Sequence, residues 1–206
     1  QTIDVYSNPE LTLLKLGQLP ALRSLKCIFN DALVSLSFKG LTNLSDVQCG
    51  SNPQLSIIET GEKINVRSLS IGDCAFRSLE FINSFPLLQE LSCSSNNLTS
   101  LDLSELPLLR SVDCSDNKKL VHLQIPEQNS VNPILQNLDC SFCYLDEKEL
   151  NAIFCVLPVA PNPYPEYPSG YGITFNGNPG SENCDRKLVE DKGWNIFVNP
   201  EDLINR

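Results

Sequence analysis

A motif of about 22 residues recurs along the chain, and this repeat limits the possible fold more than any other feature of the sequence. One copy reads LRSVDCSDN at residues 109–117. Units begin at residues 22, 44, 66, 88, 109 and 135, and a seventh unit is already under way at Gln1. Self-similarity at a fixed period is the signature of repeat architectures, in which each unit packs only on its neighbours. The sequence therefore predicts one elongated array.

Within each unit, counted from its first leucine, positions 4 and 6 are apolar while positions 3 and 5 are mostly polar. Position 6 holds Val5, Cys27, Cys49, Ile71, Cys93, Cys114 and Cys140. Side chains alternate along a strand, so positions 4 and 6 face one way and positions 3 and 5 the other. We expect one short strand per unit, and the strands stack into a parallel sheet.

Position 9 is a polar position inside the apolar pattern. It holds Asn8, Asn30, Asn52, Asn96 and Asn117, with Cys74 and Cys143 in two units. A buried amide can bond backbone groups that no strand ladder satisfies. The sequence predicts a ladder of asparagines where the chain leaves each strand.

The other half of each unit carries a second apolar series, as at Leu98, Leu101 and Leu103, with Pro107 at the bend. About ten residues with a proline or glycine at the turn are too few for a full helix. We expect extended or 3₁₀ structure on this side.

The tail departs from the repeat. Residues 146–157 predict a helix with Asp146 as its N-cap, and Pro158 follows its end. The repeat pattern then returns once, because Ile173, Phe175 and Asn178 match positions 4, 6 and 9. A short helix from Asp185 to Gly193 is expected next. Trp194, Ile196 and Val198 are expected to close the last turn.

The repeated cysteine is best explained by packing. Val5 and Ile71 occupy the same position, and an aliphatic side chain is no nucleophile, metal ligand or disulfide partner. Neighbouring strands lie about 4.8 Å apart, so distance alone does not forbid a disulfide such as Cys27 with Cys49. The odd total of nine cysteines favours reduced, buried thiols, and the only C-x-x-C pair is Cys140 with Cys143. Whether Cys155 and Cys184 pair stays open.

The pattern L-x-x-L-x-C-x-x-N-x-L-x-x-L-D-L resembles a leucine-rich repeat, most closely the short cysteine-bearing type of Bacteroidetes envelope and secreted proteins. The resemblance covers residues 1–157, and GITFNGNPGSENCDRKLVEDKGW at 172–194 is similar to the closing segment of such proteins. It implies a curved right-handed coil with a concave parallel sheet, little or no helix on the convex side and a C-terminal α/β cap. It also implies a repeat array at 1–145, a capping region at 146–206, an extracytoplasmic location at the cell surface or in secretion, and a binding role without catalytic residues.

Charge and motifs exclude several function classes. The net charge of −10 and the lack of clustered Lys and Arg argue against nucleic acid. No apolar run is long enough to span a membrane, and no signal peptide is visible. No enzyme motif is present, and the single histidine, His122, lies on the convex half. We therefore expect no enzyme, no cofactor and no metal site, although Asp113, Asp116 and Asp139 would lie close enough to attract Ca²⁺.

Large apolar side chains on the outward face gather at its ends. Tyr6, Ile28 and Phe29 lie near the start with Arg23 and Lys26 beside them; Phe142 lies near the finish. Exposed aromatic anchors are typical of protein interfaces. These six residues are our candidate binding site for a protein partner. An equally weighted alternative is that these apolar side chains form the surface on which an N-terminal cap packs.

Two alternative functions stay open. A glycan reader would need an aromatic platform, for which Tyr164, Tyr167 and Tyr171 are candidates. The chain could also be an accessory repeat region of a larger enzyme or effector.

Overall fold

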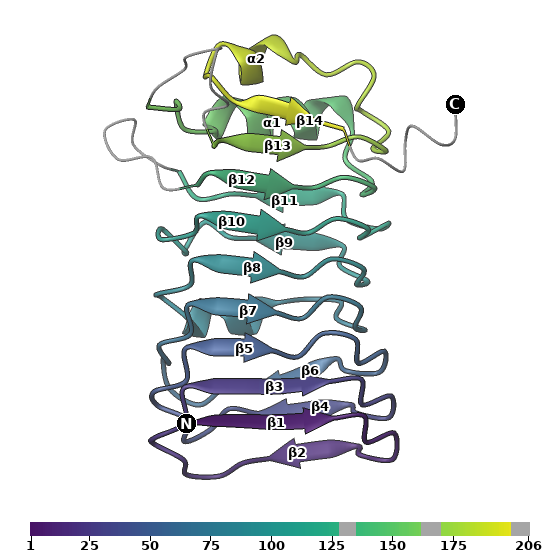
Figure 1. Ribbon diagram of the computed structural model, residues 1–206. Coiled ribbons are helices and arrows are strands. Elements are labelled where there is room, and N and C mark those ends of the chain that lie inside the picture. The colour runs from purple at the N-terminus through teal and green to yellow at the C-terminus, as the bar shows by residue number, and fades with distance from the viewer. Residues whose placement is uncertain (128–134, 162–169, 199–206) are drawn as a thin grey trace.

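A computed structural model of the chain describes residues 1–127, 135–161 and 170–198. The polypeptide winds into a parallel β-solenoid of about eight turns with little helix (Figure 1). The expected repeat fold built from parallel strands is thereby confirmed.

One strand from each of about eight turns, followed by the final strand β14, forms a single nine-stranded sheet that runs the length of the molecule. In spatial order its strands are β1 (Thr2–Tyr6), β3 (Ser24–Ile28), β5 (Asp46–Gln48), β7 (Ser68–Ser70), β8 (Glu90–Ser92), β10 (Ser111–Asp113), β12 (Asn137–Asp139), β13 (Gly172–Thr174) and β14 (Asn195–Phe197). All neighbours are parallel and in the same register, so Ile3 pairs with Leu25 and Leu25 with Val47. Position 4 is buried in each inner strand and positions 3 and 5 point outward, as the alternation predicts.

The opposite side of the solenoid is extended or 3₁₀, again as expected. Parallel strands β2 (Leu13–Lys15), β4 (Ser35–Ser37) and β6 (Ile57–Glu59) cover its first turns, and β9 (Ser100–Asp102) pairs with β11 (His122–Gln124) further along. Between these two small sheets lies the 3₁₀ helix η1 (Glu80–Ser84). The apolar core fills the space between the two sides.

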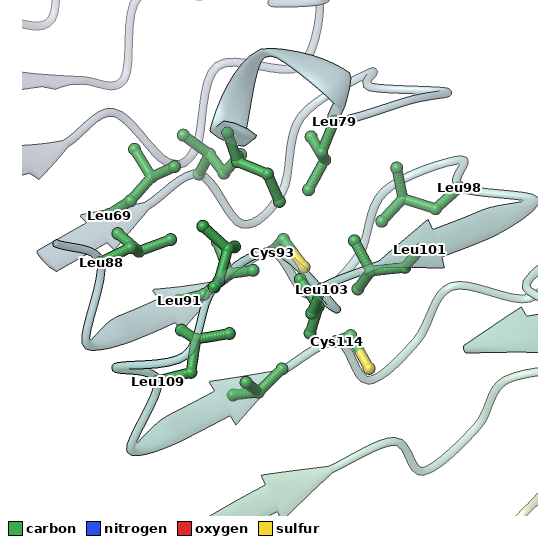
Figure 2. Packing of buried hydrophobic residues seen from close by; sticks show 14 of the residues in the cluster. Leu69, Leu79, Leu88, Leu91, Cys93, Leu98, Leu101, Leu103, Leu109 and Cys114 are labelled. Atoms are coloured by element: carbon green, nitrogen blue, oxygen red, sulfur yellow. The ribbon is translucent and has the colours of Figure 1, made fainter. Parts of the chain in front are cut away.

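The cysteines of position 6 form part of that core. Cys27, Cys49, Cys93, Cys114 and Cys140 are each 0% exposed, and Figure 2 shows Cys93 and Cys114 among leucines of the same turns. Their predicted burial is confirmed. All nine cysteines, Cys155 and Cys184 included, carry free thiols in the structure, and Cys155 is the exposed one.

Burial keeps the thiols of Cys49 and Cys74 protonated. It raises the pKa of the Cys49 thiol well above its usual range and that of Cys74 to about 11. Since the thiolate is the reactive form, these side chains act as small apolar groups. Their reduced state in solution stays a prediction.

The asparagine ladder is present where the sequence predicts it. The Asn52 amide nitrogen donates to the carbonyls of Cys27, Cys49 and Gly50 at 2.7, 2.8 and 3.1 Å. Its amide oxygen accepts from the backbone N–H of Asn30 at 2.8 Å. In the next turn the thiol of Cys74 takes the amide's place and donates to the Cys49 carbonyl at 3.5 Å. From the second turn on, a buried side chain at position 9 therefore bonds each turn to the one before it.

Position 8, just before the ladder residue, adopts the left-handed conformation in every turn. Its φ lies between 52° and 57° at Ser7, Phe29, Ser51, Asp73, Ser95, Asp116 and Phe142, and is 73° at Gly177. This sharp bend turns the chain so that the position 9 amide reaches back to the carbonyls that directly follow its own strand, as Asn96 does to Cys93 and Ser94.

The C-terminal end combines two more strands with two helices. Helix α1 (Glu147–Val156) begins at Asp146, whose side chain accepts from the Glu149 N–H at 2.8 Å, as expected. A Cβ on Gly180 would collide with the backbone of Asp146 and Glu147, which accounts for that glycine. Helix α2 (Lys187–Glu190) is shorter than predicted at both ends, because Asp185 and Arg186 precede its first α-helical residue and residues 191–193 form a turn.

The final turns match most of the expected contacts. Ile173 pairs with Leu138, so β13 is the eighth repeat strand, as expected from the return of the pattern at residues 173–178. Trp194 is buried and Ile196 half-buried, whereas Val198 is 53% exposed. The prediction that Val198 closes the last turn was wrong, because Val198 follows the end of the edge strand β14 and is exposed among the described residues.

Candidate functional site

The outward face of the nine-stranded sheet is small and polar in its middle turns. Ser70 and Ser92 face each other at position 5, and the Ser68 hydroxyl donates to the Glu90 carboxylate at 3.1 Å. Short hydroxyls and paired polar groups offer a partner hydrogen bonds and little apolar area. Any strong contact must therefore come from other turns.

Three apolar side chains at the N-terminal end of this face form what we call the aromatic cluster: Tyr6, Ile28 and Phe29. The Tyr6 and Phe29 rings meet edge to face, with centroids 5.4 Å apart and planes at 72°. Tyr6 is 60% and Phe29 47% exposed, while Ile28 is half-buried, so the isoleucine is less exposed than predicted. Ile28 loses exposure because β1 and β3 both extend to position 7, where Tyr6 pairs with it.

Phe29 is held in a costly conformation. Its φ of 57° is uncommon for any residue other than glycine and is a genuine outlier for a bulky one. Most other turns place serine, aspartate or glycine at this position. The repeat imposes this conformation at position 8 of every turn, and a bulky residue held in it costs about 1–3 kcal/mol. The backbone angle is a signal that sequence patterns do not carry.

The exposure of Phe29 is no effect of the open end of the solenoid. Its turn is flanked by β1 on one side and β5 on the other, so both neighbouring turns are already present. A missing cap would pack on the first turn, which carries Tyr6, whereas Phe29 belongs to the second turn. For Phe29 this observation favours a contact surface over a lost cap.

The two basic candidates lie next to the aromatic cluster. Arg23 directly precedes β3 and is exposed, and Lys26 is exposed at position 5, opposite Asp4 on β1. Both are available to a carboxylate on a partner.

Phe142 does not join the aromatic cluster. It follows β12, which lies six strands from β1, about 29 Å away at the usual strand spacing. Phe142 is half-buried, and a Cβ added to Gly177 in the next turn would collide with its ring. The Phe142 ring therefore packs across the following turn, and Tyr144 nearby is 61% exposed.

The acidic residues at positions 5 and 8 lie close together, as expected. Asp113 and Asp139 are paired across β10 and β12. One oxygen of each accepts from the N–H and hydroxyl of the serine two residues on, Ser115 and Ser141, with hydroxyl distances of 2.6 Å. Partial burial raises the pKa of Asp139, aided by the charges of Asp113 and Asp116 and opposed by the Ser141 hydrogen bonds.

Neither a metal site nor a glycan platform emerges from the described residues. In the described ranges, no three His, Cys, Asp or Glu side chains form a group that could hold a metal ion. His122 is exposed and lies 3.5 Å from the Glu149 carboxylate. Tyr164 and Tyr167 lie outside the described residues, and Tyr171 is buried with its ring against Trp194, centroids 5.5 Å apart.

Comparison with known proteins gives no family for the chain. No protein-family model matches it, and no curated protein is significantly similar to it. In the parts of the chain that the structure describes, neither helix is long and apolar enough to cross a membrane.

Proposed function

We propose that the chain is a noncatalytic protein-binding module of the leucine-rich-repeat type, and that the aromatic cluster is its main contact. The observation that carries this proposal is Phe29, which is exposed and strained although the turns on both sides of it are complete. The right-handed coil, the concave curvature of the sheet and the capping role of the C-terminal end belong to the same proposal. So does an origin in the cell envelope or secreted proteins of Bacteroidetes, which rests on the resemblance.

The expected partner presents an apolar side chain to Tyr6 and Phe29 and an acidic group to Arg23 or Lys26. Interface energy concentrates in a few aromatic anchors, while rim serines contribute little. The acidic group would add orientation and association rate more than affinity.

The test begins with a photo-crosslinking amino acid placed at Phe29 and, in a matched control, at Ser51, which has the same backbone conformation one turn on. Both proteins are exposed to envelope and secreted proteins of a bacterium that encodes the chain. A partner captured from position 29 alone is then purified, and its Kd is measured for three variants.

We expect Phe29→Ser and Tyr6→Ala each to weaken binding about 30-fold, as loss of an anchor worth about 2 kcal/mol does, and Ser92→Ala to change Kd less than about twofold. Phe29→Ser installs the residue that other turns carry there, so circular dichroism should be unchanged. If Phe29→Ser binds as tightly as the unmodified chain, the proposal is wrong. Binding to a purified oligosaccharide that this variant abolishes would assign the cluster to a glycan instead.

A further inference from the structure

The N-terminal end of the solenoid exposes side chains that the repeat pattern assigns to the core. Ile3 and Val5 on β1 are only half-buried, whereas Leu25 and Cys27 at the same positions of the next turn are 0% exposed. Leu11, Leu14 and Leu16 are also half-buried, and Leu13 is 45% exposed. Together they form an apolar end surface that lies across the whole width of the first turn.

Both sheets are open at this surface. β1 is the edge strand of the nine-stranded sheet and β2 the edge strand of the sheet on the other side (Figure 1). In the inner turns, the carbonyls on the corresponding strand edge accept hydrogen bonds from the preceding turn. In the inner turns the position 7 carbonyl accepts from the position 8 N–H of the preceding turn, as Ile28 does from Ser7 at 3.2 Å and Gly72 from Ser51 at 2.9 Å. The Tyr6 carbonyl is the corresponding acceptor of the first turn.

The position 9 ladder also shows that the first turn lacks a neighbour on its N-terminal side. Asn30, Asn52, Asn96, Asn117 and Asn178 each donate to the position 6 carbonyl of the turn before, at 2.7–3.2 Å. Asn8 has the same residue type at the same position, but its amide donates to its own Tyr6 carbonyl and to Asn30. It is a ladder residue whose preceding turn is missing from the contact.

We propose that this end is a docking surface for one further turn of the same kind, formed by polypeptide on the N-terminal side of Gln1. The argument is continuity with the inter-turn interface. The N-terminal surface of the first turn has the same strand edges, apolar rows and ladder amide as the surface of the second turn on which the first turn packs. A turn with apolar residues at positions 4 and 6, a position 6 carbonyl and a position 8 N–H satisfies all of them in register. This proposal rests on the end surface of the first turn, whereas the proposed function is carried by Phe29, which already has a turn on each side, so the two fail separately.

Hydrogen exchange tests the proposal in the natural full-length protein against the chain 1–206. Amides of residues 2–16 should exchange at least about 100-fold more slowly in the full-length protein, while those of β7 and β8 should not change. Equal exchange over residues 2–16 would overturn the proposal. Protection that rises with concentration in the chain 1–206, together with a doubled mass, would assign the surface to a second copy and overturn it as well.

An added turn provides the second measurement. A copy of residues 22–44 placed ahead of Gln1 continues the period, because its last leucine becomes position 1 of the unit that holds Gln1. This extension should slow exchange over residues 2–16 and raise Tm. The matched control carries aspartate in the copy at the places of Leu25 and Cys27 and should do neither. Equal behaviour of the two extensions would show that the surface does not select a turn.

Discussion

The two ends of the solenoid place identical residues at identical repeat positions in different surroundings. The pairs are Ile3 and Ile173 at position 4, Asp4 and Asp139 at position 5, and Asn8 and Asn178 at position 9. The N-terminal member is exposed or half-buried in each pair, whereas Ile173 is 0% and Asn178 5% exposed and Asp139 is half-buried. The repeat position decides which way a side chain points. The contribution of that side chain to the free energy of unfolding depends on whether turns lie on both sides of it.

The largest difference is expected for the isoleucine pair. Ile173→Ala leaves a cavity between β12, β14 and the core and should lower the free energy of unfolding by about 3 kcal/mol. Ile3→Ala removes a side chain that solvent already reaches and should cost about 1 kcal/mol. Urea unfolding followed by circular dichroism measures both. Equal costs would show that the first turn is packed as firmly as the eighth.

The asparagine pair should differ next. Asn178 donates to the carbonyls of Cys140 and Phe175, both at 2.8 Å, and accepts from the Leu145 N–H at 2.9 Å. Asn178→Ala leaves these buried groups unsatisfied and should cost about 2 kcal/mol. Asn8→Ala should cost less than about 0.5 kcal/mol, since water replaces the amide. A comparable loss in both variants, by the same urea measurement, would contradict the role we give to the preceding turn.

The smallest effect concerns the aspartates and depends on pH. The folded-state pKa of Asp139 is raised by burial, so its ionised form costs stability at every pH above that value. The cost falls as pH drops through the folded pKa and is gone below the unfolded value of about 4. Asp139→Asn should therefore be slightly more stable than the unmodified chain at pH 7, and the gap should close towards pH 4.

Asp4→Asn is the matched control for this pH series, because Asp4 is exposed at the same position of β1. Urea midpoints at pH 7 and pH 4 should hardly separate it from the unmodified chain. A gap for Asp139→Asn that widens on acidification would reverse our sign and refute the assignment of burial as the main cause.

Much of the fold could be predicted because the repeat period determines which side chains point inward and which point outward. Once Leu25 and Cys27 are placed inward, the alternation along strands places Ser24 and Lys26 outward, and the same holds in every turn. The helix after Asp146 carries its own capping and apolar signals. These are local properties, which is why a single sequence was enough for them.

The candidate site was predicted less well because exposure at a turn depends on the neighbouring turns. Phe29 and Phe142 both occupy position 8, yet the Phe29 ring meets Tyr6 edge to face and the Phe142 ring packs over Gly177. The left-handed backbone of Phe29 has no sequence signature, because serine, aspartate and phenylalanine all occur at that position. The bonds of Asp139 to Ser141 likewise depend on a backbone path that spacing alone does not reveal.

The in-register stacking of the turns also limits how the gene for such a chain can change length. Loss of residues 44–65 would place Val66 directly after the turn that begins at Leu22, and the same columns would meet again. Loss of a single residue inside a strand would instead turn every following inward side chain of that strand to solvent. Recombination between repeats that removes or adds whole periods therefore yields chains that still fold, and the number of turns can vary while their contacts stay constant.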